Sequence, residues 1–254
     1  MKESLKSKVV LALAGLAMFV SLGGQAGATP TPLELYNTGV DDSAVVKSNG
    51  SFETHWSIIS SPYGPIANPI VLTSAYGWPI AGGSSWILDN SLSAWIVPNL
   101  NEHQAPRDGV PGTLDHLVGE YVYRLTFLLP GGFNPSDHVT KIFGRMGSDD
   151  EVTKVLLNGN DFGAVQSLPG WNNWVDFSAS NVHGVGAGFV AGVNNVDFYI
   201  SNATPHHGDL PNPTGLRVEI QGTITPEPST MILLGSGLIG LFAWRAKKGK
   251  KEII

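Results

Sequence analysis

The middle of this chain alternates short runs of β-branched and aromatic residues with glycine, proline, asparagine and serine, and this pattern constrains the fold most. The chain has 31 glycines and 17 prolines among 254 residues, and its middle part lacks the sustained 3.6-residue apolar period of an amphipathic helix. In the clearest strand, Gly119 to Pro130, four residues share one face: Tyr121, Tyr123, Leu125 and Phe127. The pattern predicts an all-β fold in which two sheets form a sandwich or barrel.

Other segments carry the same strand signature between turn residues. Asn158-Gly159 follows one of them and is a strong signal for a tight hairpin turn. The further predicted strands are Phe52–Ile59, Ser85–Leu88, Ala94–Val97, Val139–Gly144, Val152–Leu157, Trp174–Phe177, Val196–Ser201 and Leu216–Ile224.

Residues 29–224 are long enough for one domain with a full hydrophobic core. Cysteine is absent from the whole sequence, so disulfides, thiolate metal sites and thiol catalysis are excluded. Acidic residues clearly outnumber basic ones in this part of the chain. We therefore expect a body that is stabilised by packing and does not bind nucleic acid.

The last thirty residues, 225–254, have an order that predicts handling by a membrane. Pro226-Glu227-Pro228 forms a stiff, extended segment that presents its carboxylate. An apolar segment at 229–244 follows, and a basic end occupies 245–251. The apolar core Met231–Trp244 would be about 21 Å long as a helix, short of the ~30 Å hydrocarbon layer. We expect a single transmembrane helix whose basic end stays in the cytoplasm.

This tail resembles the PEP-CTERM sorting signal, a Gram-negative device in which Pro-Glu-Pro, a hydrophobic helix and a basic end occur in that order. The resemblance covers roughly the last thirty residues. It implies that an exosortase, a membrane-embedded cysteine protease, recognises Pro226, Glu227 and Pro228 and cuts nearby. The body would then pass from an inner-membrane intermediate to the cell surface or the extracellular matrix.

The N-terminus predicts export in the same direction. Three lysines precede an apolar stretch from Val9 to Leu22, and Ala26-Gly27-Ala28 follows it. This order is typical of a secretory signal peptide, with a helical apolar region and a small-residue cleavage site. We therefore expect residues 1–28 to direct Sec-dependent export, with Ala26 and Ala28 defining the cleavage site.

The body has a second resemblance, which covers about half of the chain. The segments Tyr121–Phe127, Val155–Gly159 and Gly192–Phe198, with Asn202, are similar to the strand and turn order of galactose-binding-like jelly rolls. Those are noncatalytic modules of many glycosidases and surface proteins. The segment Asn212–Glu219 is similar to the end of uncharacterised exported bodies that carry this kind of tail. The resemblance implies a jelly-roll β-sandwich.

Three consecutive acids, Asp149-Asp150-Glu151, precede a predicted strand. One interpretation is a solvated turn. A second is a calcium site, because calcium prefers hard oxygen ligands. A third is a carboxylate pair for glycosidic cleavage. We expect no cofactor, with calcium at these three acids as the alternative.

Trp171-Asn172-Asn173-Trp174 follows a Pro-Gly pair and leads into a predicted strand. Aromatic faces stack on sugar rings, and asparagine both donates to and accepts from hydroxyls. These four residues are therefore a candidate glycan site. The alternative is that Trp174 belongs to the core and Trp171 packs a loop.

The sequence thus predicts an exported, noncatalytic surface or matrix protein with an all-β body and a PEP-CTERM tail. We expect exopolysaccharide as its ligand, exosortase and the Sec machinery as processing partners, and membrane contact through the C-terminal helix before processing. The alternatives are a glycan-active hydrolase or lyase, and a purely structural adhesion or matrix protein.

Overall fold

The structure, a computed structural model, describes residues 28–77, 79–81, 86–100, 114–163, 170–182, 185–186, 188–203, 212–226, 236–242 and 245. The chain divides into two units. One unit comprises Thr31–Ile224 and is called the body below. The other comprises Met1–Pro30 and Thr225–Ile254.

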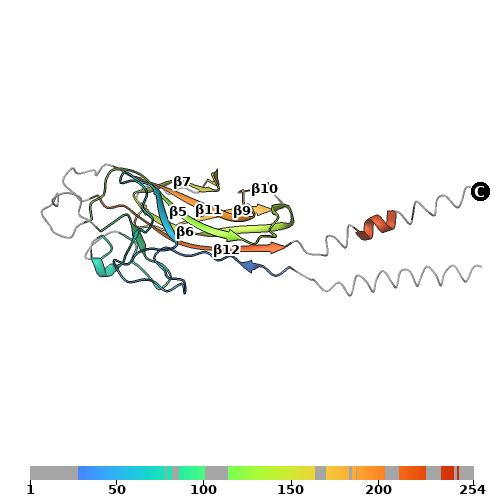
Figure 1. Cartoon of the computed structure of the whole chain (residues 1–254), viewed down its shortest axis with the longest axis horizontal. Coiled ribbons are helices and arrows are strands. Elements are labelled where there is room, and N and C mark those ends of the chain that lie inside the picture. The colour runs from blue at the N-terminus through green and yellow to red at the C-terminus, as the bar shows by residue number, and fades with distance from the viewer. Residues whose placement is uncertain are drawn as a thin grey trace, which may run out of the picture. The chain divides into compact units, whose positions relative to one another are not determined.

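The body is a sandwich of two antiparallel sheets, as predicted (Figure 1). The larger sheet has seven strands in the order β10-β9-β6-β12-β4-β3, with β1 also paired to β12. The smaller sheet has the order β2-β5-β11-β7-β8. The strands are β1 (Thr31–Pro32), β2 (Trp56–Ser60), β3 (Ile70–Leu72), β4 (Trp95–Val97), β5 (Gly119–Leu129), β6 (His138–Asp149), β7 (Glu151–Leu157), β8 (Asn160–Asp161), β9 (Val175–Val182), β10 (Val185–Gly186), β11 (Gly192–Asn202) and β12 (Gly215–Pro226); the 3-10 helices are η1 (Ser74–Tyr76) and η2 (Pro135–Asp137).

The strand predicted at Gly119 to Pro130 is confirmed as β5. It pairs with β11 along its whole length, from Gly119↔Asn202 to Leu129↔Gly192. Its predicted inner face is buried, because every second side chain of a strand points to the same side. β6, β9, β11 and β12 are longer than their predicted segments.

The predicted turn at Asn158-Gly159 is also confirmed. Both residues have positive φ, 51° at Asn158 and 82° at Gly159, which is the signature of a type I′ turn. The turn joins β7 to β8, which pair at Leu157↔Asn160. Asparagine and glycine adopt this conformation more readily than other residues do, so the sequence determines the turn locally.

The predicted strand Ser85–Leu88 is wrong over its described part, Trp86–Leu88, which forms a loop. The Trp86 N–H donates to the carbonyl of Pro79, and the Ile87 N–H to that of Trp171. These backbone donors are therefore used by other loops and not by a neighbouring strand.

The segment predicted as a strand from Phe52 to Ile59 becomes a strand only at Trp56. Glu53 explains why the strand starts at a later residue than predicted. Its fully buried carboxylate accepts from the backbone N–H groups of Gly39, Thr54 and His55 at 2.7–2.8 Å. A side chain that captures nearby backbone donors competes with ladder formation.

The main core fills the space between the two sheets. It contains aromatic and aliphatic side chains from both inner faces, among them Trp56, Tyr121, Tyr123, Phe177 and Phe198. Trp56 and Phe177 each contact the ring of Phe198, with centroids 5.6 and 5.5 Å apart. The two sheets are therefore joined by aromatic packing.

A second apolar cluster lies on the other side of β4. Ile96 of β4 belongs to the main core, whereas Trp95 and Val97 pack into this second cluster with Trp86 and Leu114. The rings of Trp86 and Trp95 lie 4.2 Å apart. Both faces of β4 are therefore covered by apolar side chains. The loop at residues 86–93 lies beside the part of the larger sheet's outer face that this second cluster leaves open.

The two ends of the body lie side by side. Thr31 and Pro32 of β1 pair with Ile224 and Thr223 of β12, and the Leu33 N–H donates to the carbonyl of Gly222. The pairing closes the body two residues before Pro226.

In the other unit, residues 236–242 are helical. No helix within the described residues combines the length and the apolar character needed to cross a membrane. The predicted transmembrane segment 229–244 is described only at these seven positions, and the predicted signal helix lies outside the described residues. Both therefore stay predictions.

Close contact between β6 and β12 leads to a prediction about stability. A Cβ added at Gly144 would collide with the carbonyl oxygen of Glu219, whereas one added at Gly131 has no atom within 4 Å. We predict that Gly144→Ala lowers the free energy of unfolding by about 3 kcal/mol or more.

The matched control, Gly131→Ala, should stay within roughly 0.5 kcal/mol of the wild type. Urea denaturation followed by tryptophan fluorescence measures both. Equal stability of the two variants would contradict the close approach of β6 and β12.

Candidate functional site

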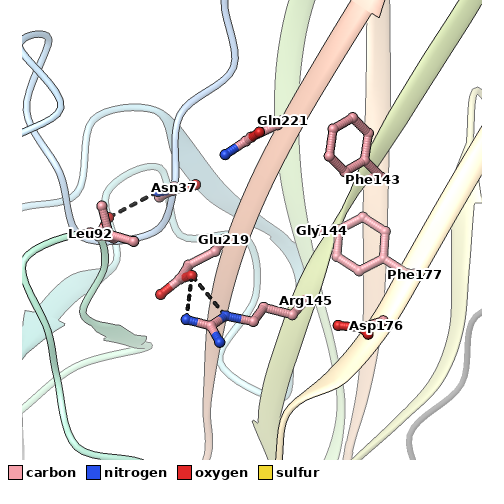
Figure 2. A pocket seen from close by; sticks show the side chains of 9 residues that line it. All are labelled: Asn37, Leu92, Phe143, Gly144, Arg145, Asp176, Phe177, Glu219 and Gln221. Carbon is pink, nitrogen blue, oxygen red and sulfur yellow. Dashed lines mark hydrogen bonds and ion pairs between the residues drawn. The ribbon is translucent and has the colours of Figure 1, made fainter.

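A groove of about 440 Å³ lies on the outer face of the larger sheet. Its floor comes from β6, β9 and β12, and one wall comes from the loops at Asn37 and Leu92 (Figure 2). The lining residues are Asn37, Leu92, Phe143, Gly144, Arg145, Asp176, Phe177, Glu219 and Gln221.

Strand alternation places the functional side chains in this groove. On β6, Ile142 and Met146 are buried in the main core, so Phe143 and Arg145 point to the opposite face. On β12, Ile220 is buried between Glu219 and Gln221. The inner residues form the core, and the residues between them form a polar outer surface.

An ion pair lies at the centre of the groove. The Nε and Nη2 atoms of Arg145 lie 2.8 and 2.7 Å from Oε2 of Glu219 (Figure 2). The other carboxylate oxygen, Oε1, accepts from Asn90 Nδ2 at 2.9 Å and from Ser93 Oγ at 3.0 Å. Both oxygens of Glu219 are therefore occupied.

These contacts determine the charge state of Glu219. Burial alone would raise its pKa, but hydrogen bonds from Arg145, Asn90 and Ser93 outweigh burial, and the pKa is lowered from its ordinary 4.5. Glu219 is therefore ionised at neutral pH and balances the charge of Arg145.

Arg217 lies under the wall of the groove. Its side chain is fully buried; Nε donates to Ser93 Oγ at 2.9 Å, and Nη1 donates to the carbonyls of Ile87 and Leu88. Burial lowers the pKa of Arg217 to about 10, which leaves it charged at neutral pH. Arg217 thus holds the 86–93 loop against β12.

Trp174 covers both guanidinium groups. The Cζ atom of Arg145 lies 4.4 Å from the ring centroid, and that of Arg217 lies 5.0 Å from it. The indole is half-buried and lies outside the main core. Cation–π contacts of this kind fix the ring beside the groove.

The other residues of the predicted glycan site lie elsewhere. Trp171 is half-buried and packs against the second apolar cluster, and its carbonyl accepts from the Ile87 N–H at 2.8 Å. Asn172 and Asn173 are exposed and hydrogen-bonded to each other. The structure therefore places Trp174 against Arg145, which lines the groove, and gives Trp171 a packing role in the loop.

The groove contains residues that the sequence reasoning missed, above all Phe143, Arg145, Asp176 and Gln221. A signal for them exists in the alternation along β6, β9 and β12, where polar or aromatic residues alternate with buried ones. Which strands become neighbours depends on the sheet order. That order cannot be read from local patterns in a single sequence.

Of the three acids at 149–151, Asp149 and Asp150 interact with each other, and each also has a partner of its own. The Asp149 carboxyl is buried and accepts from Trp86 Nε1 at 2.8 Å, and burial, reinforced by Asp150, raises its pKa well above the ordinary value. Asp150 accepts from the Ala203 N–H at 2.7 Å, and Glu151 begins β7. Within the described ranges, no group of three or more acidic or histidine side chains is arranged to hold a metal ion.

The segment Asn212–Glu219 links residues 115–116 to the 86–93 loop. The Asn212 N–H donates to Asp115, and the Thr214 N–H donates to the buried ring of His116. Arg217 and Glu219 hold the 86–93 loop, as described above. These contacts give the segment a structural role.

The sorting residues are described only in part. Pro226 is the last residue of β12, and Glu227 and Pro228 lie outside the described residues. Of the predicted signal-cleavage residues, Ala26 is outside them, and Ala28 is described but belongs to no helix or strand.

The fold and groove define a two-sheet β-sandwich protein with a polar, aromatic-lined surface site. Residues 225–248 match the PEP-CTERM protein-sorting motif. The chain therefore carries a PEP-CTERM sorting tail, which implies export, a membrane-anchored intermediate and exosortase as the processing partner. The match covers the tail and not the sandwich.

Comparison with curated proteins found no match. Among solved structures, a Paenibacillus sp. cycloisomaltooligosaccharide glucanotransferase complexed with cycloisomaltoheptaose is 8% identical, with 52% of this chain and 14% of that chain covered and a TM-score of 0.23. An Arthrobacter globiformis T6 isomalto-dextranase complexed with panose is 9% identical, with 77% and 32% covered and a TM-score of 0.28. The matches span less than a third of either enzyme, and scores this low indicate nothing about function.

The lowered pKa of Glu219 leads to a pH-dependent prediction. A carboxylate whose pKa is lower in the folded state stabilises the fold above its unfolded pKa, and this contribution is lost as the pH falls through the folded value. We predict that Glu219→Gln costs about 2 kcal/mol at pH 7, because hydrogen bonds to a charged group are lost. The cost should shrink as the pH falls below 4.5.

Glu120→Gln is the matched control, because Glu120 is exposed on β5 of the other sheet. Urea titrations of both variants at pH 7 and at pH 3.5 measure the effect. A cost for Glu219→Gln that is the same at both pH values would contradict the ionised pair.

Proposed function

We propose that this protein is an exported, noncatalytic polysaccharide-binding protein of the cell surface or extracellular matrix. The PEP-CTERM motif at 225–248 supports sorting, and the groove on the outer face of the larger sheet supports binding. The proposal includes a Sec signal peptide at 1–28, a membrane helix at 229–244 and a galactose-binding-like jelly-roll body.

The observation that carries the binding proposal is the set of groups that line the groove. Phe143 and Leu92 offer apolar surface, Gln221 an exposed amide, and Asp176 an exposed carboxylate opposite Arg145 in the strand register. Sugar rings have apolar faces that stack on aromatic rings, and they carry hydroxyls that both donate and accept hydrogen bonds. The groove presents groups for both kinds of contact.

The state of Glu219 favours binding over hydrolysis. A glycosidase needs a carboxylic acid whose raised pKa keeps a proton for the leaving group. Glu219 has a lowered pKa, and both of its oxygens accept hydrogen bonds from protein groups. In this groove the carboxylate orients Arg145 and does not act as an acid.

Processing by exosortase is the first part of the proposal to test. We predict that Glu227→Ala leaves the full-length chain in the inner membrane, because the carboxylate between two prolines is the recognised group. The matched control is Glu252→Ala, which removes a carboxylate from the same tail and should leave processing intact. Mass spectrometry of surface material should find no peptide from the basic end. Surface protein with an intact basic end would contradict processing.

Binding in the groove is tested with paired aromatic variants. We predict that Phe143→Ala weakens polysaccharide binding about five- to tenfold, because an aromatic stacking contact is worth roughly 1–1.5 kcal/mol. Trp171→Ala is the control, since Trp171 packs in the loop and should retain affinity. A glycan array, followed by calorimetry on the retained polysaccharide, measures both. Loss of binding in Trp171→Ala alone would place the site in that loop.

A further inference from the structure

A second hollow, of about 590 Å³, lies further along β9. One wall comes from the hairpin turn after β7 and from β8, and the other comes from β9 and β10. Its lining residues are Gly159, Asn160, Asp161, Phe162, Ser178, Ala179, Ser180 and Gly186.

The two hollows adjoin consecutive residues of one strand. The groove is lined by Asp176 and Phe177, and the second hollow by Ser178 to Ser180. Asp176, Ser178 and Ser180 are all exposed and share the outer face of the sheet, because alternate residues of a strand point the same way. At about 3.3 Å per residue, β9 advances about 13 Å from Asp176 to Ser180. The second hollow opens at the edge of the sandwich, because its other wall, β8 and the turn before it, belongs to the smaller sheet. An elongated ligand that runs along β9 and passes over this edge meets both hollows.

The second hollow offers the same chemistry as the groove. The hydroxyls of Ser178 and Ser180, the amide of Asn160 and the carboxylate of Asp161 are exposed. Beside them, the ring of Phe162 is half-buried; it packs against the main core, with its centroid 6.5 Å from that of Phe177, and leaves part of its surface exposed. Hydrogen-bonding groups around an aromatic ring suit a sugar unit, as they do at Phe143.

The charges of the lining residues limit which polysaccharides can bind. Among the described residues that line the second hollow, Asp161 supplies a carboxylate and none supplies a cation. In the groove, the guanidinium of Arg145 is paired with Glu219 and lies opposite Asp176. Lys141 adds a cation beside the hollows, because it lies opposite Ser180 in the register and its Nζ atom is 5.1 Å from the ring centroid of Phe143. The carboxylates of Asp161, Asp176 and Glu219 still outnumber the cations Arg145 and Lys141, so these residues give no surplus of positive charge to hold a polyanionic chain.

We propose that the two hollows are subsites of one binding site, which holds an internal stretch of an uncharged polysaccharide along β9. This inference rests on the proposed function and adds the ligand class and the second subsite. Binding through several consecutive sugars should be stronger for longer chains, because each occupied subsite adds contacts.

The test is native affinity electrophoresis of the full chain in a polyoxyethylene detergent, which carries no sugar. The gels contain dextran, galactomannan or hydroxyethylcellulose as neutral probes, or alginate as an acidic probe. Asp161→Asn keeps the shape of the side chain and removes its charge, Phe143→Ala disables the groove, and Glu120→Gln is the matched charge control on the smaller sheet.

We expect retardation by at least one neutral polymer, weakened about tenfold in Asp161→Asn because hydrogen bonds to a charged acceptor are lost. Glu120→Gln should behave as the wild type. Oligosaccharides of the retained polymer should bind more tightly with length, and the effect of Asp161→Asn should appear only in the longer ones.

The other outcomes separate the inference from the proposed function. Binding that Phe143→Ala abolishes, but that neither Asp161→Asn nor chain length changes, overturns the second subsite and leaves the groove as a binding site. Retardation by alginate alone overturns the uncharged ligand. No retardation by any polymer defeats the inference and the proposed function together.

Discussion

The outer face of the larger sheet depends on one buried cation, the guanidinium of Arg217 on β12. A fully buried charge is tolerated only when protein groups replace its hydration. Here the carbonyls of Ile87 and Leu88, the hydroxyl of Ser93 and the ring of Trp174 take that role. The contacts also fix the loop that forms the groove wall, so solvation of one charge and the shape of the surface site are coupled.

The hydrogen bonds of Arg217 also connect it to the residues of the groove. Ser93 accepts from Arg217 and donates to Glu219, whose other oxygen holds Arg145. Arg145 in turn lies against the ring of Trp174. Arg145 and Glu219 are thus held in place by their neighbours, and for the proposed binding site such preorganisation would lower the loss of conformational entropy.

Local patterns in the sequence predicted the features that depend on neighbouring residues. Alternation predicted β5, and the preference of asparagine and glycine for positive φ predicted the turn at 158–159. Prediction failed where distant partners decide the outcome: Trp86–Leu88 has a strand-like composition, but its backbone groups bond to other loops and to Arg217. The candidate site followed the same rule, since Trp174 was recognised as an aromatic candidate, whereas Phe143, Asp176 and Gln221 meet only through the order of β9, β6 and β12.

The tail bears on where the protein is delivered, and the body bears on what the protein does there. The sorting motif begins within two residues of the last paired position of β12 and specifies delivery. The groove belongs entirely to the body and would act only after delivery. The most direct test of the central claim is an NMR titration of the isotope-labelled protein with a neutral polysaccharide. We predict that backbone amide signals of Phe143, Asp176 and Gln221 and the indole signal of Trp174 shift together. Shifts confined to Trp171–Asn173 or to the smaller sheet would contradict binding in the groove.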